Sequence, residues 1–265
     1  MDFTQLSHDL AALCRTTAGF IRQEAATFDR AKVEHKGVHD LVSYVDQETE
    51  RRLVAGLRQL LPGAGFITEE GTAGPDTRTE EFTWIIDPLD GTTNFVHGLP
   101  VYSISVALLH RHGLAVGVVH EVGRDESFRA VRGGGAFCND QPIGVSAVAD
   151  LHSSLVATGF PYTNFEQLHA YLQVLGAFMT RTHGVRRLGS AAVDLAYVAA
   201  GRFEGFFEYN LNSYDVAAGI LLVREAGGHV SQFLEPGDPL FGREVLASNG
   251  HLHAEMQATI GEFWQ

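Results

Sequence analysis

Acidic residues border apolar runs at three places in this sequence. Glu69 and Glu70 come directly after "GFIT", and Asp215 comes directly before "VAAGILLV". Asp87 and Asp90 stand at the end of the apolar run "FTWII". Hard divalent cations such as Mg²⁺ bind carboxylate oxygens and are commonly held by a few carboxylates together with a substrate phosphate. The three clusters therefore make a magnesium site the first hypothesis for this chain.

Residues 84–95, "WIIDPLDGTTNF", carry the densest part of this pattern. Asp87 and Asp90 flank the rigid Pro88 and could chelate or bridge cations, but Asp before Pro and Asp before Gly are equally common in ordinary turns. The next residues favour chemistry. Gly91 lets a backbone N–H group approach a ligand closely, and a helix beginning at Thr92 would offer free N–H groups to an anion.

Carboxylates that bind cations beside amides that bind phosphate are what cleavage of a phosphate ester requires. The uncatalysed reaction is so slow that acceleration of up to ~10²¹-fold is needed, and metal ions supply it by polarising the phosphoryl group and activating water. The sequence contains no G-x-S-x-G, H-E-x-x-H or P-loop lysine motif, so these alternative hydrolytic and nucleotide-binding designs are not indicated.

Two regions with different orders of predicted helices and strands must position these acidic residues. The first opens with apolar residues at helical spacing, continues with a second helix in "DQETERRLVAGLRQLLPG", and then has the runs "YSISVALL", "LAVGVVHEV" and "SFRAVRGGGAFCN", which predict an antiparallel meander. The second alternates strand and helix patterns from "SSLVATGF" to "SYDVAAGILLVREAGG". We divide the chain into an α+β half, 1–148, with most of the acidic clusters, and an α/β half, 149–265.

Bulk composition excludes several classes. The 265 residues include 45% hydrophobic and 19% charged residues and carry a net charge of -13, which disfavours nonspecific binding to nucleic acid or anionic membrane. The two cysteines, Cys14 and Cys138, are expected to be reduced structural thiols. No signal-peptide pattern or apolar run of transmembrane length is present, so a soluble cytoplasmic protein is expected.

The segments "WIIDPLDGTTNFVHGLP" and "YDVAAGILLVREAGG" resemble the two signature segments of the inositol monophosphatase family. "GFITEEG", "NDQPIGVS", "ATGFPY" and "RRLGSAAVDLAYVAAGRFEGFFE" follow in the family's order, so the resemblance covers nearly the whole chain. It implies a layered αβαβα sugar-phosphatase fold with the site between the two halves. It also implies a Mg²⁺-dependent, lithium-sensitive phosphoric monoester hydrolase that forms a homodimer.

The resemblance also implies a role for each matching residue. Glu69, Asp87 and the Leu89 carbonyl would bind a first Mg²⁺, and Asp87, Asp90 and Asp215 a second. Glu69 would hold a weaker third ion, and Mn²⁺ could substitute. A matching Asp46–Thr92 pair would orient the attacking water. The implied substrate contacts are Asp90, the backbone N–H groups of Gly91 and Thr92, Gly189, Ser190, Ala191, Glu208 and Asp215.

Tyr214 departs from the family pattern, and Lys36 allows two interpretations. Tyr214 stands where the second signature usually has Trp, and we expect packing to change little. Lys36 matches a loop near the site, where it could neutralise phosphate or be a solvated surface residue. The expected substrate is myo-inositol monophosphate, and the alternatives are fructose-1,6-bisphosphate, histidinol phosphate and 3′-phosphoadenosine phosphate. A regulator that binds the transcription machinery is the alternative outside enzymes.

Overall fold

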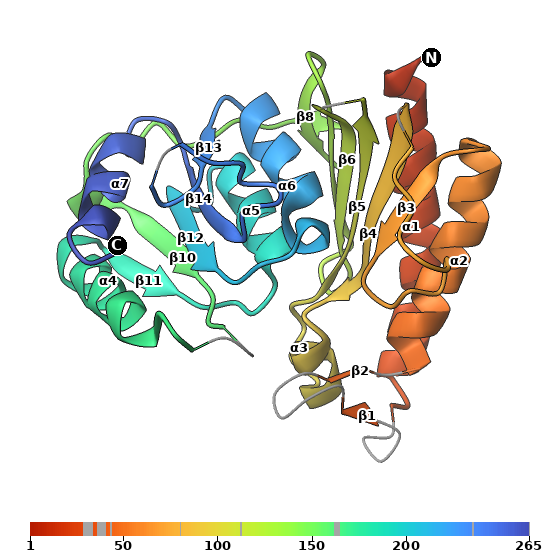
Figure 1. The fold of residues 1–265 in the computed structure, drawn as a ribbon, viewed down its shortest axis with the longest axis horizontal. Coiled ribbons are helices and arrows are strands. Elements are labelled where there is room, and N and C mark those ends of the chain that lie inside the picture. The colour runs from red at the N-terminus through yellow and green to blue at the C-terminus, as the bar shows by residue number, and fades with distance from the viewer. Residues whose placement is uncertain are drawn as a thin grey trace.

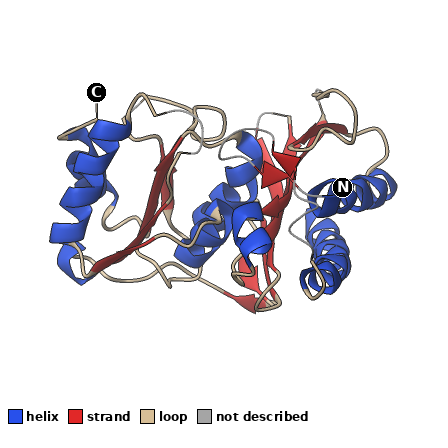
Figure 2. Ribbon diagram, turned by 90° about the horizontal axis from the view of Figure 1, so that it is seen from below, coloured by secondary structure: helices blue, strands red, loops and turns tan. Residues whose placement is uncertain are grey.

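Helices and sheets alternate in five layers in the computed structural model, which describes residues 1–28, 34–35, 41–42, 44–79, 81–111, 113–161, 165–234 and 236–264. Figures 1 and 2 both show the layers side by side. The helices of the three helical layers are α1 (Phe3–Ala25) with α2 (Tyr44–Leu60), α5 (Ala191–Ala199) with α6 (Ser213–Glu225), and α4 (Leu168–Arg181) with α7 (His253–Gly261). This is the αβαβα arrangement expected from the sequence.

A seven-stranded sheet separates α1 and α2 from α5 and α6. Its order follows the chain, and every neighbouring pair is antiparallel except β3 and β4. The predicted meander is therefore confirmed. The strands are β3 (Gly65–Thr68), β4 (Phe82–Asp90), β5 (Ser103–His110), β6 (Gly113–Glu121), β7 (Glu126–Val131), β8 (Gly135–Cys138) and β9 (Gln141–Pro142). A separate pair, β1 (Glu34–His35) and β2 (Leu41–Val42), is antiparallel.

A five-stranded sheet lies between α5–α6 and α4–α7, in the order β11-β10-β12-β14-β13. Its strands are β10 (Leu155–Thr158), β11 (Gly184–Arg186), β12 (Gly205–Tyr209), β13 (His229–Ser231) and β14 (Glu244–Ser248). The patterns read from the sequence end at residue 228, so β13, β14 and α7 were not predicted. The division at residue 148 falls between the two sheets and stays a prediction, since one apolar cluster around α5 and α6 contacts both.

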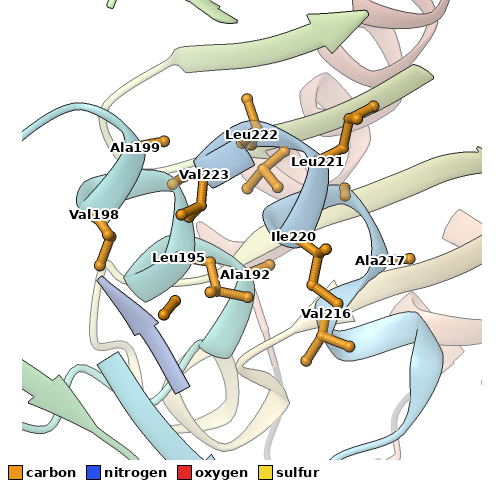
Figure 3. Close-up of a cluster of buried hydrophobic side chains, with 14 of the residues drawn as sticks. Ala192, Leu195, Val198, Ala199, Val216, Ala217, Ile220, Leu221, Leu222 and Val223 are labelled. Atoms are coloured by element: carbon orange, nitrogen blue, oxygen red, sulfur yellow. The ribbon is translucent and has the colours of Figure 1, made fainter. Parts of the chain in front are cut away.

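The central layer is packed closely enough to fix how the two sheets face each other. Figure 3 shows the buried alanine, leucine, isoleucine and valine side chains that α5 and α6 contribute to it. Small residues allow the close approach. A methyl group at Gly117 of β6 would lie 3.1 Å from the backbone of Ala218, and one at Gly219 of α6 would lie 2.5 Å from the Leu195 side chain.

Replacing Gly219 by Ala tests this packing. The new methyl group overlaps Leu195 of α5, and overpacking a core costs about 1–3 kcal/mol, so the denaturant midpoint of unfolding should fall. Gly176→Ala is the matched control, since Gly176 is also inside a helix but has no atom within 4 Å of the added methyl group. There the gain in helix propensity should raise stability by about 0.5–1 kcal/mol. Equal shifts in both variants would contradict the packing argument.

Candidate active site

A bulge in β4 places Asp87 and Asp90 on one face of the sheet. Two residues three positions apart in a regular strand point to opposite faces. Here Asp87 pairs with Ser105 and Asp90 with Ser103, so three steps in β4 oppose two in β5. The extra residue of a bulge restores the common face. It falls at Pro88–Leu89, where proline could not have donated a ladder hydrogen bond anyway.

Gly91 turns the chain from β4 into the short helix α3 (Thr92–His97), at the end of the seven-stranded sheet. Its φ of 98° is the left-handed conformation that favours glycine. A side chain there would also lie 3.0 Å from the Val101 carbonyl and 3.2 Å from the Gly189 carbonyl. Backbone geometry and available space thus both require glycine at the position where the sequence predicts contact with phosphate.

The hydroxyl group of Thr92 lies 2.8 Å from a carboxylate oxygen of Asp46 and 3.0 Å from the Leu89 carbonyl. Asp46 is buried in the first turn of α2. A hydroxyl group donates one hydrogen, and the carboxylate is the stronger acceptor. The Asp46–Thr92 pair expected from the resemblance is therefore close enough to act together, across elements 46 positions apart.

Glu69 follows β3 on a segment whose backbone is hydrogen-bonded to Glu50, a glutamate of α2. The carboxylate of Glu50 is fully buried and accepts the backbone N–H groups of Glu70 (2.8 Å) and Thr72 (2.6 Å). The Glu69 N–H group in turn donates to the Ile86 carbonyl at 3.3 Å. These bonds fix Glu69 beside the end of β4.

The second half of the chain supplies Asp215 and the N-terminus of α5. Asp215 is the third residue of α6, and its carboxylate accepts the Asn212 N–H group at 2.6 Å in a capping box. Asp90 reaches across from β4: one of its oxygens accepts the Ser190 hydroxyl and the Ala192 N–H group, both at 2.7 Å. The two acidic groups thereby meet at the boundary between the sheets.

A cavity of ≈ 180 Å³ gathers nearly all of the predicted site residues. Asp46 is connected to it through Thr92, and Lys36 lies outside the described residues. A larger cavity of ≈ 930 Å³ at the far end of α6 contains none of the predicted residues. Those that line the smaller cavity are Glu69, Asp87, Leu89, Asp90, Gly91, Thr92, Gly189, Ser190, Ala191, Glu208 and Asp215.

Burial and mutual repulsion dominate the electrostatics of this cavity. Burial raises the pKa of Asp87 well above its usual value, and the charges of Glu69, Asp90 and Asp215 raise it further. Burial also raises the pKa of Asp90 to about 6, although hydrogen bonds from Ser190 and the α5 backbone lower it. The pKa of Asp215 rises to about 7, because of burial and then the charge of Asp90.

The family assignment follows from a match over almost the full length. Residues 5–265 match the model of the "Inositol monophosphatase family". The chain belongs to the inositol monophosphatase family.

Similar proteins carry two kinds of name. The chain is 44% identical over 230 residues to "Inositol-1-monophosphatase" of Rhizobium meliloti, which covers 86% of each chain. It is 42% identical over 237 residues to "Putative Nus factor SuhB" of Neisseria meningitidis serogroup B, covering 89% of this chain and 90% of the relative. The solved structure of "extragenic suppressor protein suhB" from Bartonella henselae superposes with a TM-score of 0.90 at 36% identity, covering 97% and 98% of the two chains.

Inositol monophosphatases are generally metal-dependent, and the donor set of this cavity fits a hard cation. All candidate ligands are oxygen atoms, and the carboxyl groups of Asp87 and Glu69 are in hydrogen-bonding contact, so they need a shared proton or a cation between them. Within the described ranges, no group of three or more His, Cys, Asp or Glu side chains is arranged so that it alone could hold a metal ion. A bound Mg²⁺ would therefore also draw on a backbone carbonyl, water and phosphate.

Three residues in or beside this candidate site were not predicted from the sequence. Glu50 is a polar residue on the buried side of α2, which the helical spacing alone could have indicated. Asp194 is the one charged residue of α5 and lines the cavity. Arg187 also lines it and lowers the pKa of Asp90, Asp194 and Glu208. The arginine lies in the quoted "RRLGSAAV", but nothing in that segment distinguishes it from Arg186.

No helix of the described residues has both the length and the apolar character needed to span a membrane.

The raised pKa values predict how metal-free protein responds to pH. The folded state binds protons that the unfolded state releases, so the Asp215 contribution lowers the free energy of unfolding as pH rises from the ordinary value of 3.8 to about 7. Asp215→Asn removes this ionisation. Thermal unfolding in chelator should show a parent midpoint that falls more steeply across this range than that of the variant, and Mg²⁺ should raise the parent midpoint most at the upper end. Parallel curves would contradict the coupling.

Proposed function

We propose that this protein is a Mg²⁺-dependent phosphomonoesterase of the inositol-phosphate phosphatase class, acting on a small polyol or sugar phosphate, with myo-inositol monophosphate first. The observation that carries this proposal is the Thr92–Asp46 hydrogen bond directly beside the carboxylates of Asp87 and Asp90. It combines a group that can orient water with groups that suit a divalent cation. Two to three ions would be held by Glu69, Asp87, the Leu89 carbonyl, Asp90 and Asp215, and Mn²⁺ could replace Mg²⁺.

The protein groups divide the work of hydrolysis between them. Bound Mg²⁺ would neutralise phosphoryl charge and lower the pKa of the attacking water. Because Thr92 gives its hydrogen to Asp46, its oxygen lone pairs are available to accept a hydrogen bond from that water and aim it at phosphorus. The N–H groups of Gly91 and Thr92 would hold the phosphate oxygens. Glu69, which is held beside the end of β4, would support the same water.

The far wall of the cavity would receive the alcohol part of the substrate. Gly189, Ser190 and Ala191 form the entry to α5, and Glu208 lies at the end of β12 with 7% of its surface exposed. Burial raises the pKa of Glu208 well above its usual value. Hydroxyl groups suit this wall because they both donate and accept hydrogen bonds. The sequence gives no clear signal for an adenine pocket, so 3′-phosphoadenosine phosphate is the least favoured alternative.

The relatives named Nus factor SuhB favour a second function, binding to the transcription machinery. The two functions are compatible, because such binding would use the surface and hydrolysis the cavity. Every acidic position that the resemblance assigns to metal binding is kept here. Sensitivity to lithium and assembly into a homodimer belong to the same proposal and rest on the family resemblance.

Replacing Asp90 by Asn tests the enzyme proposal. The amide keeps the size of the side chain and an acceptor for Ser190 and Ala192, but it removes a negative charge that the cation would need. Phosphate release from myo-inositol 1-phosphate with Mg²⁺ should fall below detection, while the thermal midpoint changes little. Asp238→Asn, which lines the larger cavity at the far end of α6, is the control and should keep parent activity. Full activity of the Asp90 variant would overturn the metal assignment.

Thr92→Val tests the orientation of water separately from metal binding. Valine keeps the branched shape but cannot donate to Asp46 or accept from water, so kcat should fall about 10²-fold or more, with little change in KM. Thr92→Ser restores the hydroxyl group and should recover most of the rate. A serine variant as slow as the valine variant would show that shape, rather than the hydroxyl group, is what the site requires.

A further inference from the structure

Asp194 is a buried acidic residue to which neither the family resemblance nor the proposed function assigns a role. It is the one charged residue of α5, a helix whose other members are Ala, Val, Leu and Tyr. Only 1% of its surface is exposed, and its Oδ1 atom has no hydrogen-bond partner within the described structure. Buried polar atoms in folded proteins are nearly always hydrogen-bonded, because an unpaired one keeps the cost of leaving water without compensation. A ligand would supply the missing partner.

The position of Asp194 indicates which ligand could be the missing hydrogen-bond partner of Oδ1. Its side chain lines the same cavity as the proposed metal ligands, together with Glu208 and Arg187. The three groups interact: the charge of Glu208 raises the pKa of Asp194 after the larger effect of burial, and Arg187 lowers it. Asp194 and Glu208 come from α5 and β12, the elements proposed above to receive the alcohol, whereas Gly91 and Thr92, proposed to hold the phosphate, follow β4 of the other sheet. Asp194 therefore lies on the alcohol side of the cavity rather than at the phosphate.

Glu121 shows that an unpaired buried carboxyl group does not by itself indicate a ligand, so the position of Asp194 in the cavity is the deciding observation. It too is 1% exposed, and both of its carboxyl oxygens lack a hydrogen bond within the described structure. Burial raises its pKa to about 7. Yet Glu121 lies at the end of β6 and lines neither cavity. The chain thus offers two similarly buried carboxyl groups, of which only Asp194 belongs to a residue that lines the cavity proposed to bind substrate.

We propose that Asp194 is a specificity residue, whose Oδ1 atom accepts the hydrogen of a substrate hydroxyl group and so selects polyol phosphates over phosphate esters without hydroxyl groups. This inference rests on the proposed phosphatase function and adds to it a binding group on α5. Oδ1 can accept such a bond whether the carboxyl group is ionised or protonated, since it keeps lone pairs in both states. No change at the phosphate is involved, so the effect belongs to binding.

The test compares two substrates in three variants. Myo-inositol 1-phosphate offers hydroxyl groups to α5, whereas p-nitrophenyl phosphate has none. Asp194→Leu keeps roughly the shape and a good helix former but removes both oxygens, and Asp194→Asn keeps one acceptor. The leucine variant should raise KM for the inositol phosphate about tenfold or more, which corresponds to one lost hydrogen bond to a buried or charged group. KM for the aryl phosphate and both kcat values should stay near those of the parent.

The unfolding temperature of the variants distinguishes a role in substrate binding from a structural role, because loss of a structural contact would lower it. If Oδ1 has no hydrogen-bond partner until substrate binds, the leucine variant should unfold at the parent temperature or above, because it removes an unpaired buried polar group. The asparagine variant should show a smaller KM change of the same kind. Glu121→Gln, the control, should leave the ratio of the two KM values unchanged.

The outcomes separate this inference from the proposed function. A parent protein that hydrolyses neither substrate contradicts the phosphatase proposal itself. A parent that hydrolyses both, with KM values in the leucine variant that shift equally or not at all, overturns only the role of Asp194. If the leucine variant does not fold, the ratio of KM values in Asp194→Ala, which also lacks both oxygens, decides. An unchanged ratio there overturns the inference, and a ratio raised for the inositol phosphate supports it.

Discussion

The Asp90 carboxylate joins the two halves of the molecule at the site. It ends a strand of the first sheet, yet its oxygen accepts hydrogen bonds from Ser190 and Ala192 at the start of α5, 2.7 Å away in each case. A negative charge is favourable there, because the first turn of a helix presents unpaired N–H groups and the positive end of its dipole. The same interaction that fixes α5 against β4 therefore holds a proposed metal ligand in place, so the geometry of the site and the contact between the sheets cannot vary independently.

This arrangement concentrates negative charge where water is scarce. Asp87, Asp90 and Asp215 all have raised pKa values, mainly through burial, and each charge opposes the ionisation of the next. Gathering them costs folding free energy, which the apolar core around α5 and α6 must offset. The cost has a use. Groups that repel one another in metal-free protein gain the most when a divalent cation binds, so cation affinity is obtained at the expense of stability.

The sequence was informative where local chemistry and local structure coincide. Residues 84–95 predicted both the acidic pair and the turn after it, since these depend on residues close together in the chain. The layered fold was predicted from the family resemblance, which covers nearly the whole chain. The bulge that turns Asp87 and Asp90 to one face could not be read from the same letters, because it depends on pairing with Ser103 and Ser105 of β5. Asp194 was missed for a related reason: its importance comes from burial, and burial is decided by elements distant in sequence. Glu50 differs, because the helical spacing of α2 could have indicated its buried side.

The origin of each wall of the cavity bears on how such a site can change its substrate. The groups proposed to act on phosphate come mostly from β4 and α3, which are held by backbone constraints at Gly91 and by the bulge. The groups proposed to meet the alcohol come from the start of α5, the end of β12 and the segment after β11, where the side chains of Asp194, Glu208 and Arg187 supply the contacts. Side chains can be exchanged without moving the backbone, whereas the phosphate wall cannot change without breaking the turn. Substrate preference can therefore diverge among proteins of this fold while the hydrolytic groups stay fixed, and the residues that distinguish one substrate from another should be sought in the second half of the chain.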